Sequence, residues 1–216
     1  MHIECHADTA LSERARFELA SYRHEVFVER LGWDLPCQPG LDQDQFDLPQ
    51  AVHLAARADD GHLIGYARLL PTTGRYLLAE LFPDLLGQQA APQDAAVWEL
   101  SRYAAMDTHG SGNASDELFV GKQVLLRAIL TAAGSGAERL VFCTSVAIER
   151  LAMRWGVDIH RMAPPVRHGR QLLVAAVIEF SEQTLRALSN RDSLALSAAA
   201  VAIPRAASAP AVIRLT

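Results

Sequence analysis

The chain has 216 residues, of which 50% are hydrophobic and 21% are charged, a balance typical of a folded domain rather than a disordered one. Its formal net charge of -5 offers no basic surplus for binding nucleic acid. The first residues lack the order of a signal peptide, no apolar run is long enough to span a bilayer, and the three cysteines lack metal-ligand spacing. We therefore expect a cytoplasmic protein with reduced thiols.

The first predicted element is a helix over residues 12–30, where apolar side chains recur at spacings of three and four. Ser12 is a suitable N-cap for this helix, and Gly32 can end it. A polar loop punctuated by Pro and Gly follows over residues 33–50.

Strands dominate the rest of the domain. Residues 52–57 and 63–70 are predicted to pair as a hairpin through Asp59-Asp60-Gly61. Further along we expect strands at residues 96–103, 140–144 and 172–180, and helices at residues 117–133 and 145–155. This order favours a mixed sheet covered by helices on both faces. Residues 1–190 are assigned to one domain, and residues 191–216, rich in Ala, Ser and Pro, to a C-terminal tail.

The loop after the first helix carries three carboxylates, Asp42, Asp44 and Asp47, beside Trp33 and Phe46. A solvated acidic loop is one interpretation. A site for a cationic ligand is another, because carboxylates and aromatic faces both attract positive charge. A calcium site is a weaker alternative, since the segment lacks the regular ligand positions of an EF-hand.

Two arginines occupy positions where a partner is expected. Arg23 falls late in the first helix, and Arg68 lies among apolar residues within a predicted strand. An unpaired buried charge is costly, so the nearby aspartates are natural partners. Structural pairing and ligand binding both explain this arrangement.

Strand alternation over residues 97–103 places Glu99, Ser101 and Tyr103 on one face and Arg102 on the other. Glu99 and Arg102 can share a site only if a bulge or a strand end redirects one of them. A buried glutamate can serve as a general base, and a structural ion pair is the alternative role.

Five short segments together resemble the LuxI-type acyl-homoserine lactone synthases in order and spacing. They are Arg23-(three residues)-Phe27, Leu31-Gly32-Trp33, Asp44-Gln45-Phe46-Asp47, Ala67-Arg68-Leu69 and Glu99-Leu100-Ser101-Arg102. The resemblance covers about residues 1–180. It implies an α/β fold, specifically a GNAT-like three-layer α/β/α sandwich with a mixed, V-split central sheet.

The resemblance also implies the reaction: an acyl group passes to the amine of S-adenosylmethionine, and the product closes to a lactone and releases methylthioadenosine. Glu99 and Arg102 are then the catalytic residues, with Glu99 as the base. The implied S-adenosylmethionine site consists of Arg23, Phe27, Trp33, Asp44, Asp47, Arg68 and Ser101. Acidic groups suit the amine and sulfonium, arginine suits the carboxylate, and aromatic rings suit the sulfonium and adenine. No metal or other cofactor is expected.

By the same resemblance, the acyl chain lies in an apolar tunnel in the second half of the fold. Candidate lining residues are Phe82, Leu100, Phe142, Thr144, Val146, Met153 and Leu173. Taken one by one, the apolar members are better explained as ordinary core. Thr144 occupies a position where some relatives that use 3-oxo chains carry threonine, so we leave the chain length and the oxidation at C3 open.

Arg150 and Arg154 lie four residues apart on a predicted helix and so share a face. The resemblance implies that such residues dock the acidic acyl carrier protein, and Lys122 and Arg127 can extend the patch. A solvated helix face is the alternative, and Glu149 dilutes the charge. Some members of the family use acyl-CoA instead, and nothing in the sequence excludes that donor.

Two other functions compete with this one. A GNAT-type N-acetyltransferase would carry a Gly-rich loop that grips the CoA pyrophosphate, whereas residues 109–113 lack its initial spacing. A non-catalytic sensor of S-adenosylmethionine or acyl chains would not need both Glu99 and Arg102. Neither nucleic acid nor a membrane is expected as a partner.

Overall fold

In the computed structural model, which describes residues 1–110 and 113–189, eight strands form one mixed sheet. The strands are β1 (His2–Ala7), β2 (Val52–Arg57), β3 (Leu63–Pro71), β4 (Val97–Ala105), β5 (Arg139–Ser145), β6 (Ile159–Arg161), β7 (Val166–His168) and β8 (Gln171–Glu179). Their order is β1-β2-β3-β4-β5-β8-β6, and β7 also pairs with β8. The predicted tail lies outside the described residues, as do residues 111 and 112 of the Gly-rich segment.

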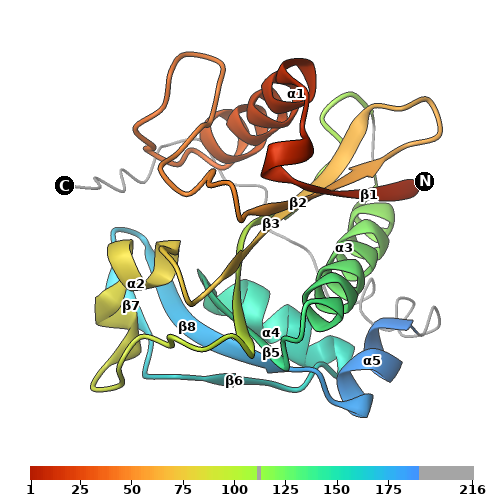
Figure 1. The fold of residues 1–216 in the computed structure, drawn as a ribbon. Helices are drawn as coiled ribbons and strands as arrows, with labels where there is room; N and C mark the ends of the chain where they lie inside the picture. Colours follow the sequence, from red (N-terminus) through yellow and green to blue (C-terminus); the bar gives the residue numbers. More distant parts are fainter. Residues whose placement is uncertain (111–112, 190–216) are drawn as a thin grey trace.

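Helices cover both faces of this sheet, as predicted (Figure 1). They are α1 (Glu13–Arg23), α2 (Leu77–Leu81), α3 (Ala114–Gly134), α4 (Val146–Trp155) and α5 (Glu182–Ser189), with 3-10 turns η1 (Asp8–Ala10) and η3 (Pro83–Leu86) and a π-helical segment η2 (His24–Arg30). Alternate residues of β2 and β3 pack against α1 on one face and against α3 on the other. The result is the expected three-layer α/β/α sandwich. None of the helices within the described residues is long and apolar enough to cross a membrane.

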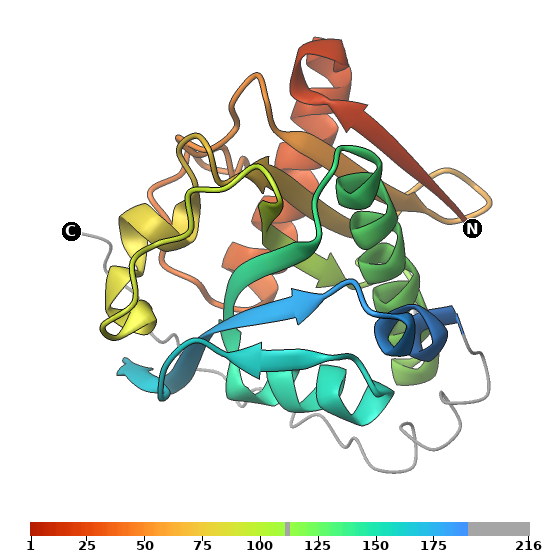
Figure 2. The ribbon, with the colours of Figure 1, turned by 60° about the horizontal axis from the view of Figure 1, so that its bottom comes forward.

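The sheet splits between β4 and β5, the one parallel pair among its hydrogen-bonded neighbours in the described residues. These strands pair only where Val97–Glu99 faces Arg139–Val141, although both continue further. Beyond that point they separate, which is the predicted V. Figure 2 shows β8 and β6 running side by side in the part of the sheet beyond β5.

Most predicted elements are confirmed, and their ends follow from local chemistry. The Ser12 side chain accepts a hydrogen bond from the backbone N–H of Ala15 at 3.2 Å and so caps α1. The predicted helix does not stay α-helical to its end, because η2 widens into π-helix after Arg23. Ser145 caps α4, and Gly156 ends it with φ of 88°.

Three strands and two helices were not predicted, namely β1, β6, β7, α2 and α5, and neither were the 3-10 turns η1 and η3. β1 is an edge strand whose sequence, HIECHA, is half polar, so it carries little strand signal. β6 and β7 have three residues each and α2 has five, too few for a periodic pattern.

Candidate active site

The site lies on the sheet face opposite α3, where β3 and β4 pair. Arg68 pairs with Ser101 across the two strands, and Leu70 pairs with Glu99. Because side chains two residues apart share a face, Arg68, Ser101 and Glu99 all project to this side. The guanidinium Nε of Arg68 donates to Ser101 Oγ at 3.1 Å. The acidic loop then lies over these strands, with the backbone N–H of Asp42 bonded to the carbonyl of Ala20 in α1 at 3.0 Å.

A bulge in β4 brings Arg102 into the same site. The register with β3 shifts between Tyr66 and Arg68, so β4 carries one extra residue there. Arg102 has φ of 51°, the left-handed region that non-glycine residues rarely adopt. The Arg102 side chain therefore lies on the same face of the sheet as that of Ser101, although strict alternation would place it on the opposite face. This is the bulge that Glu99 and Arg102 need in order to share a site. Tyr103 is consequently on the other face, where its hydroxyl donates to the carbonyl of Gly121 in α3, so its predicted placement beside Glu99 is wrong.

Three arginines and three aspartates form one buried cluster, which we call the arginine–aspartate network: Arg23, Arg68, Arg102, Asp42, Asp44 and Asp47. Arg68 donates to Asp44 at 2.6 Å and to Asp47 at 2.7 Å. Its side chain is 0% exposed. The expected partner of this strand arginine is thus found in the acidic loop.

Each of the other two arginines contacts two or more of the aspartates. Arg23 donates to Asp47 at 2.7 Å and to both oxygens of Asp42 at 3.2 Å. Arg102 donates to Asp42 at 2.7 Å and lies 2.9 Å from Asp44. Asp42 thereby bridges Arg23 and Arg102.

The arginines keep the loop carboxylates ionised. Burial alone would raise the pKa of Asp44, but Arg68 and Arg102 lower it below its usual range. The same balance holds for Asp47, where burial is outweighed by Arg23 and Arg68. Carboxylates already paired with guanidinium groups are poor ligands for calcium, so the network argues against the calcium alternative and against a solvated acidic loop.

Aromatic rings line the network. Phe27 and Trp33 have ring centroids 4.8 Å apart, and the guanidinium of Arg102 lies 5.7 Å from the Phe27 centroid. Phe46 lies beneath Arg68 at 5.9 Å. Phe27 and Phe46 are buried, whereas Trp33 is half-buried and is the most accessible of the three rings. Such faces suit a cation or a planar base.

Glu99 is fully buried and contacts backbone rather than arginine. Its two carboxylate oxygens accept hydrogen bonds from the N–H groups of Leu77 at 3.0 Å and Leu78 at 2.6 Å, in the first turn of α2. Burial raises its pKa to about 7, although these two N–H groups lower it. A carboxylate with a pKa near neutrality can both accept and release a proton.

The structure thus brings together all the residues proposed for S-adenosylmethionine. Arg102 lies beside them, and Glu99 lies two residues before Ser101 on the same face of the sheet. Two further members of the site were missed. Asp42 was noticed only as part of an acidic loop, and Tyr66, whose ring lies 5.7 Å from the Arg23 guanidinium, carried no sequence signal. Asp42 could have been found by matching the three arginines of the motif with the three aspartates of the acidic loop.

The proposed acyl-pocket residues are divided between the two sides of the sheet. Leu100, Phe142 and Val146 belong to the apolar cluster under α3 and α4, and Phe82 and Leu173 belong to the cluster beside α2. Thr144 is half-buried on β5. Met153 is 54% exposed on α4, so its assignment to a buried lining is wrong.

The proposed docking helix α4 exposes Arg150 and Arg154, as expected. Glu149 points inward instead of diluting their charge, and its carboxylate accepts from Arg161 at 2.5 and 2.6 Å. Lys122 is 1% exposed, with its ammonium 6.0 Å from the Trp155 ring, so it does not extend a docking surface. Arg127 is exposed on α3, where its Nε lies 3.3 Å from Cys5 Sγ.

Comparison with known proteins shows the family of the chain. A sequence model of the family described as Autoinducer synthase matches residues 8–188. The chain belongs to that family. An acyl-homoserine-lactone synthase of Ralstonia nicotianae is 38% identical over 185 residues, which cover 85% of this chain and 91% of the relative. TofI, crystallised in a ternary complex with an inhibitor and MTA, is 39% identical, with a TM-score of 0.78 over 90% of this chain and 100% of its own.

The chain is therefore an acyltransferase of the acyl-homoserine lactone synthase type. Its fold is shared more widely. An acyl-CoA N-acyltransferase from Pseudomonas aeruginosa has a TM-score of 0.57 over 82% of this chain at 18% identity, which supports the GNAT-like architecture alone. Membership of the synthase family replaces the N-acetyltransferase alternative.

Proposed function

We propose that the enzyme acylates the amine of S-adenosylmethionine and then closes the lactone, with release of methylthioadenosine. The observation that carries this proposal is the arginine–aspartate network, which offers both signs of charge and aromatic faces next to a glutamate of raised pKa. TofI, a relative of 39% identity, was crystallised with MTA. Methylthioadenosine is the by-product expected of this reaction.

S-adenosylmethionine would bind by exchanging ion pairs within the network. Its carboxylate can take the place of an aspartate against Arg23 or Arg68, while its ammonium takes the place of a guanidinium against Asp44 or Asp47. A substrate with both charges can leave the buried network neutral, whereas a singly charged ligand would leave one partner unpaired. Phe27 and Trp33 can then receive the sulfonium and the adenine.

Glu99 is proposed as the base that takes the proton from the ammonium of S-adenosylmethionine, directly or through a water. Its ionised form is favoured by the N–H groups of Leu77 and Leu78, and burial keeps its pKa near that of a useful base. Arg102 would hold the substrate beside it. The free amine attacks the thioester carbonyl, and a backbone N–H near the split between β4 and β5 can stabilise the oxyanion. Collapse of the tetrahedral intermediate breaks the C–S bond, and the leaving thiolate takes the second proton of the amine to become the free thiol of the donor.

Lactone closure needs less help from the protein. The carboxylate of the acylated intermediate attacks its own γ-carbon, and the sulfonium leaves as methylthioadenosine. Since the leaving group is already activated, holding the two ends together can supply most of the rate. The proposed reaction uses neither a metal nor another resident cofactor.

The acyl chain is proposed to enter through the split in the sheet. Because β4 and β5 separate beyond Glu99, a chain at the split can contact both apolar clusters, with Phe82 and Leu173 on one side and Leu100 and Phe142 on the other. This explains how candidate residues on opposite faces can line one path. Val146 and Thr144 would lie further along it.

We propose acyl carrier protein as the donor, docked on α4, with acyl-CoA as the alternative. The exposed face of α4 carries Arg150 and Arg154, and Glu149 is turned inward and neutralised by Arg161. An acidic carrier would therefore meet the positive charges of Arg150 and Arg154 without an opposing charge from Glu149. The proposal places the enzyme in the cytoplasm, where both substrates are made.

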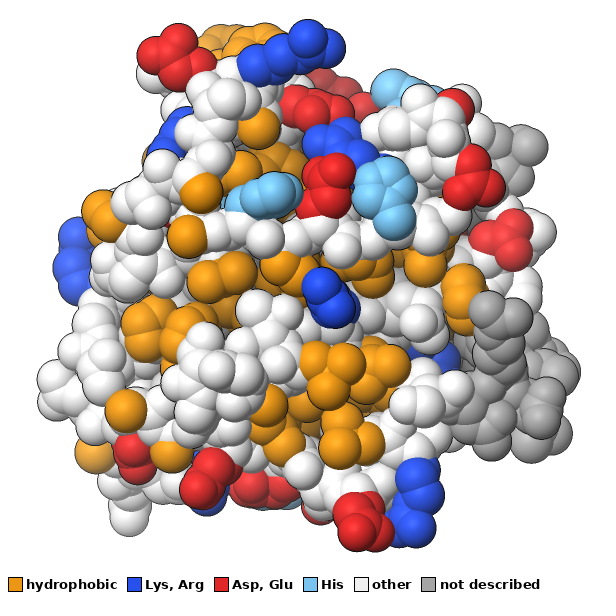
Figure 3. Space-filling view, turned by 45° about the vertical axis from the view of Figure 1, so that its right-hand side comes forward, with side chains coloured by type: hydrophobic (Ala, Val, Ile, Leu, Met, Phe, Trp, Pro, Cys, Tyr) orange, Lys and Arg blue, Asp and Glu red, His pale blue; other side chains and the backbone are white. Residues whose placement is uncertain are grey.

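Neither nucleic acid nor a membrane takes part in the proposed reaction. Figure 3 shows the side of the molecule that carries α3, where acidic and basic side chains are scattered among apolar and neutral ones. That face carries no continuous basic stripe among its described residues.

The decisive experiment supplies the purified protein with S-adenosylmethionine and a panel of acyl-carrier and acyl-CoA donors. We expect methylthioadenosine and a lactone, detected by mass spectrometry, only when both substrates are present. Binding of S-adenosylmethionine without lactone from any donor would support a sensor instead and overturn the proposal.

A further inference from the structure

A chain of buried polar side chains runs behind Arg23, away from Glu99. His53 on β2 lies between two partners: its Nδ1 is 2.6 Å from the Tyr66 hydroxyl, and its Nε2 is 3.2 Å from Asp8 Oδ1. All three side chains are buried, and Asp8 is also bonded to Arg16 of α1. We call Asp8, His53 and Tyr66 the support chain.

The support chain has a defined hydrogen-bond direction. Asp8 accepts a hydrogen bond from the Arg16 guanidinium, so its carboxylate serves as the acceptor at this end of the chain. His53 must then donate from Nε2 and accept at Nδ1, and Tyr66 must donate its hydroxyl hydrogen to Nδ1. Burial agrees with this, because it raises the pKa of Tyr66 to about 12 and lowers the pKa of His53, which keeps both groups neutral.

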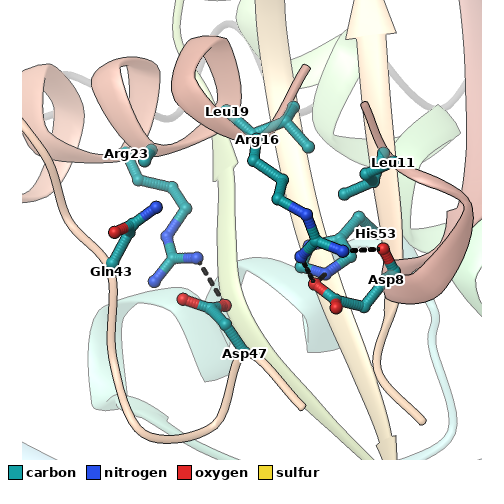
Figure 4. A pocket seen from close by; sticks show the side chains of 9 residues that line it. Asp8, Leu11, Arg16, Leu19, Arg23, Gln43, Asp47 and His53 are labelled. Carbon is teal, nitrogen blue, oxygen red and sulfur yellow. Dashed lines mark hydrogen bonds and ion pairs between the residues drawn. The ribbon is translucent and has the colours of Figure 1, made fainter. Parts of the chain in front are cut away.

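The end of the support chain lies under the network. The Tyr66 ring is fully buried, and the Arg23 guanidinium lies 5.7 Å from its centroid while its N–H groups point to Asp42 and Asp47. Figure 4 shows a pocket beside Arg23, with Asp8, Arg16 and His53 together on one side and Arg23 with Asp47 on the other. This pocket, of about 30 Å³, borders Arg23 on the side toward His53.

We propose that the Asp8–His53–Tyr66 support chain is a positioning device for Arg23, which fixes the Tyr66 ring as a floor and thereby sets the affinity for S-adenosylmethionine. The inference rests on the proposed function, in which Arg23 binds the substrate carboxylate. Without the hydroxyl anchor, the ring can tilt and no longer holds the Arg23 guanidinium in one position. Since Arg23 would hold the substrate in the ground state and the transition state alike, its loss of order should raise KM and leave kcat nearly unchanged.

The test compares two tyrosines that each lose one buried hydroxyl bond. Tyr66→Phe breaks the support chain, whereas Tyr103→Phe removes a bond to the Gly121 carbonyl on the opposite face of the sheet. Each variant loses a single hydroxyl hydrogen bond, so both should fold and lose a similar, small amount of stability. We expect the KM for S-adenosylmethionine to rise about three- to tenfold in Tyr66→Phe, with kcat within about twofold, and to stay at the wild-type value in Tyr103→Phe.

Two substitutions of His53 sharpen the result. His53→Gln keeps one acceptor for Tyr66 and one donor for Asp8, so its KM for S-adenosylmethionine should stay close to that of the wild type. His53→Leu keeps neither and should match Tyr66→Phe. An unchanged KM in Tyr66→Phe, or an equal rise in Tyr103→Phe, would overturn the positioning role.

Titration calorimetry with S-adenosylmethionine separates failure of this inference from failure of the proposed function. If the wild type binds the substrate and makes lactone while Tyr66→Phe binds equally well, only the support chain is refuted. If the wild type does not bind S-adenosylmethionine, the proposed function fails and the inference falls with it.

Discussion

Replacing Glu99 by Gln should stop the chemistry while leaving the fold almost as stable as before. The substitution keeps the shape of the side chain and removes its charge. A general base contributes about 10²–10⁴-fold to a rate, so single-turnover acylation at pH 7.5 should fall by about that factor. This corresponds to about 3–5 kcal/mol in the activation free energy.

The stability of the variant follows from two opposed contributions. A pKa raised from 4.5 to about 7 means that holding the ionised Glu99 in the fold costs about 3 kcal/mol at alkaline pH. Gln escapes this cost, but its amide can accept only one of the two N–H groups of Leu77 and Leu78, which loses about 1–3 kcal/mol. At pH 7.5 the two free energies of unfolding should therefore agree within about 2 kcal/mol.

The pH dependence checks the sign of this argument. Because the folded pKa of this acid is raised, its unfavourable contribution is absent below pH 4.5 and develops fully as the pH rises past about 7. The variant should thus gain stability relative to the wild type between those values. Thermal unfolding at pH 5 and pH 7.5 beside quenched-flow acylation measures both effects.

Glu149→Gln is the matched control, because Glu149 is a buried glutamate that is paired with Arg161 away from the site. It should lose stability, since Arg161 is left without its partner, yet acylate at the wild-type rate with saturating substrates. A near-normal acylation rate in folded Glu99→Gln would refute the base assignment. The proton would then have to pass to water or to another carboxylate.

Three further predictions concern the base, the network and the docking helix. The wild-type acylation rate should rise with pH through about 7 and then level off as Glu99 ionises, and a flat profile from pH 5.5 to 8.5 would contradict this. Asp42→Asn, which leaves Arg23 and Arg102 without their shared partner, should lower the free energy of unfolding by about 3–5 kcal/mol in chemical denaturation. Breaking the exposed Arg75–Glu80 pair by Glu80→Gln is the control and should change the free energy of unfolding far less, because solvent screens that pair. Replacing both Arg150 and Arg154 by Glu should raise the KM for acyl carrier protein and weaken its salt dependence, with the KM for S-adenosylmethionine unchanged; an unaltered carrier KM would remove α4 from the docking site.

Much of the candidate site could be predicted because its residues have strong local reasons for their positions. A charged residue such as Arg68 within an apolar strand needs a buried partner, and the nearest surplus of acid is the loop with Asp44 and Asp47. Strand alternation then places Ser101 and Glu99 on the face of Arg68. These inferences need only short-range rules.

The surroundings of Glu99 were beyond such rules. The N–H groups that hold its carboxylate come from α2, a five-residue helix whose sequence, LLAEL, has no cap and no periodic pattern. Nothing in the residues next to Glu99 indicates that backbone rather than arginine is its partner. The choice between a base and a member of an ion pair therefore depends on a contact over 21 positions in the chain.

The bulge at Arg102 shows why the spacing of this motif cannot be interpreted by alternation alone. Regular pairing would turn the Arg102 side chain toward α3, into the apolar cluster that contains Leu100, where the charge would have no counterion. The observed left-handed φ costs about 1–2 kcal/mol for a residue with a Cβ atom. The ion pairs with Asp42 and Asp44 offset that cost, because they exist only in the bulged conformation. The acidic loop therefore stabilises the bulged backbone of β4, and the bulge in turn places Arg102 in the site. Only with this bulge can Glu99 and Arg102, three residues apart on one strand, face the same substrate.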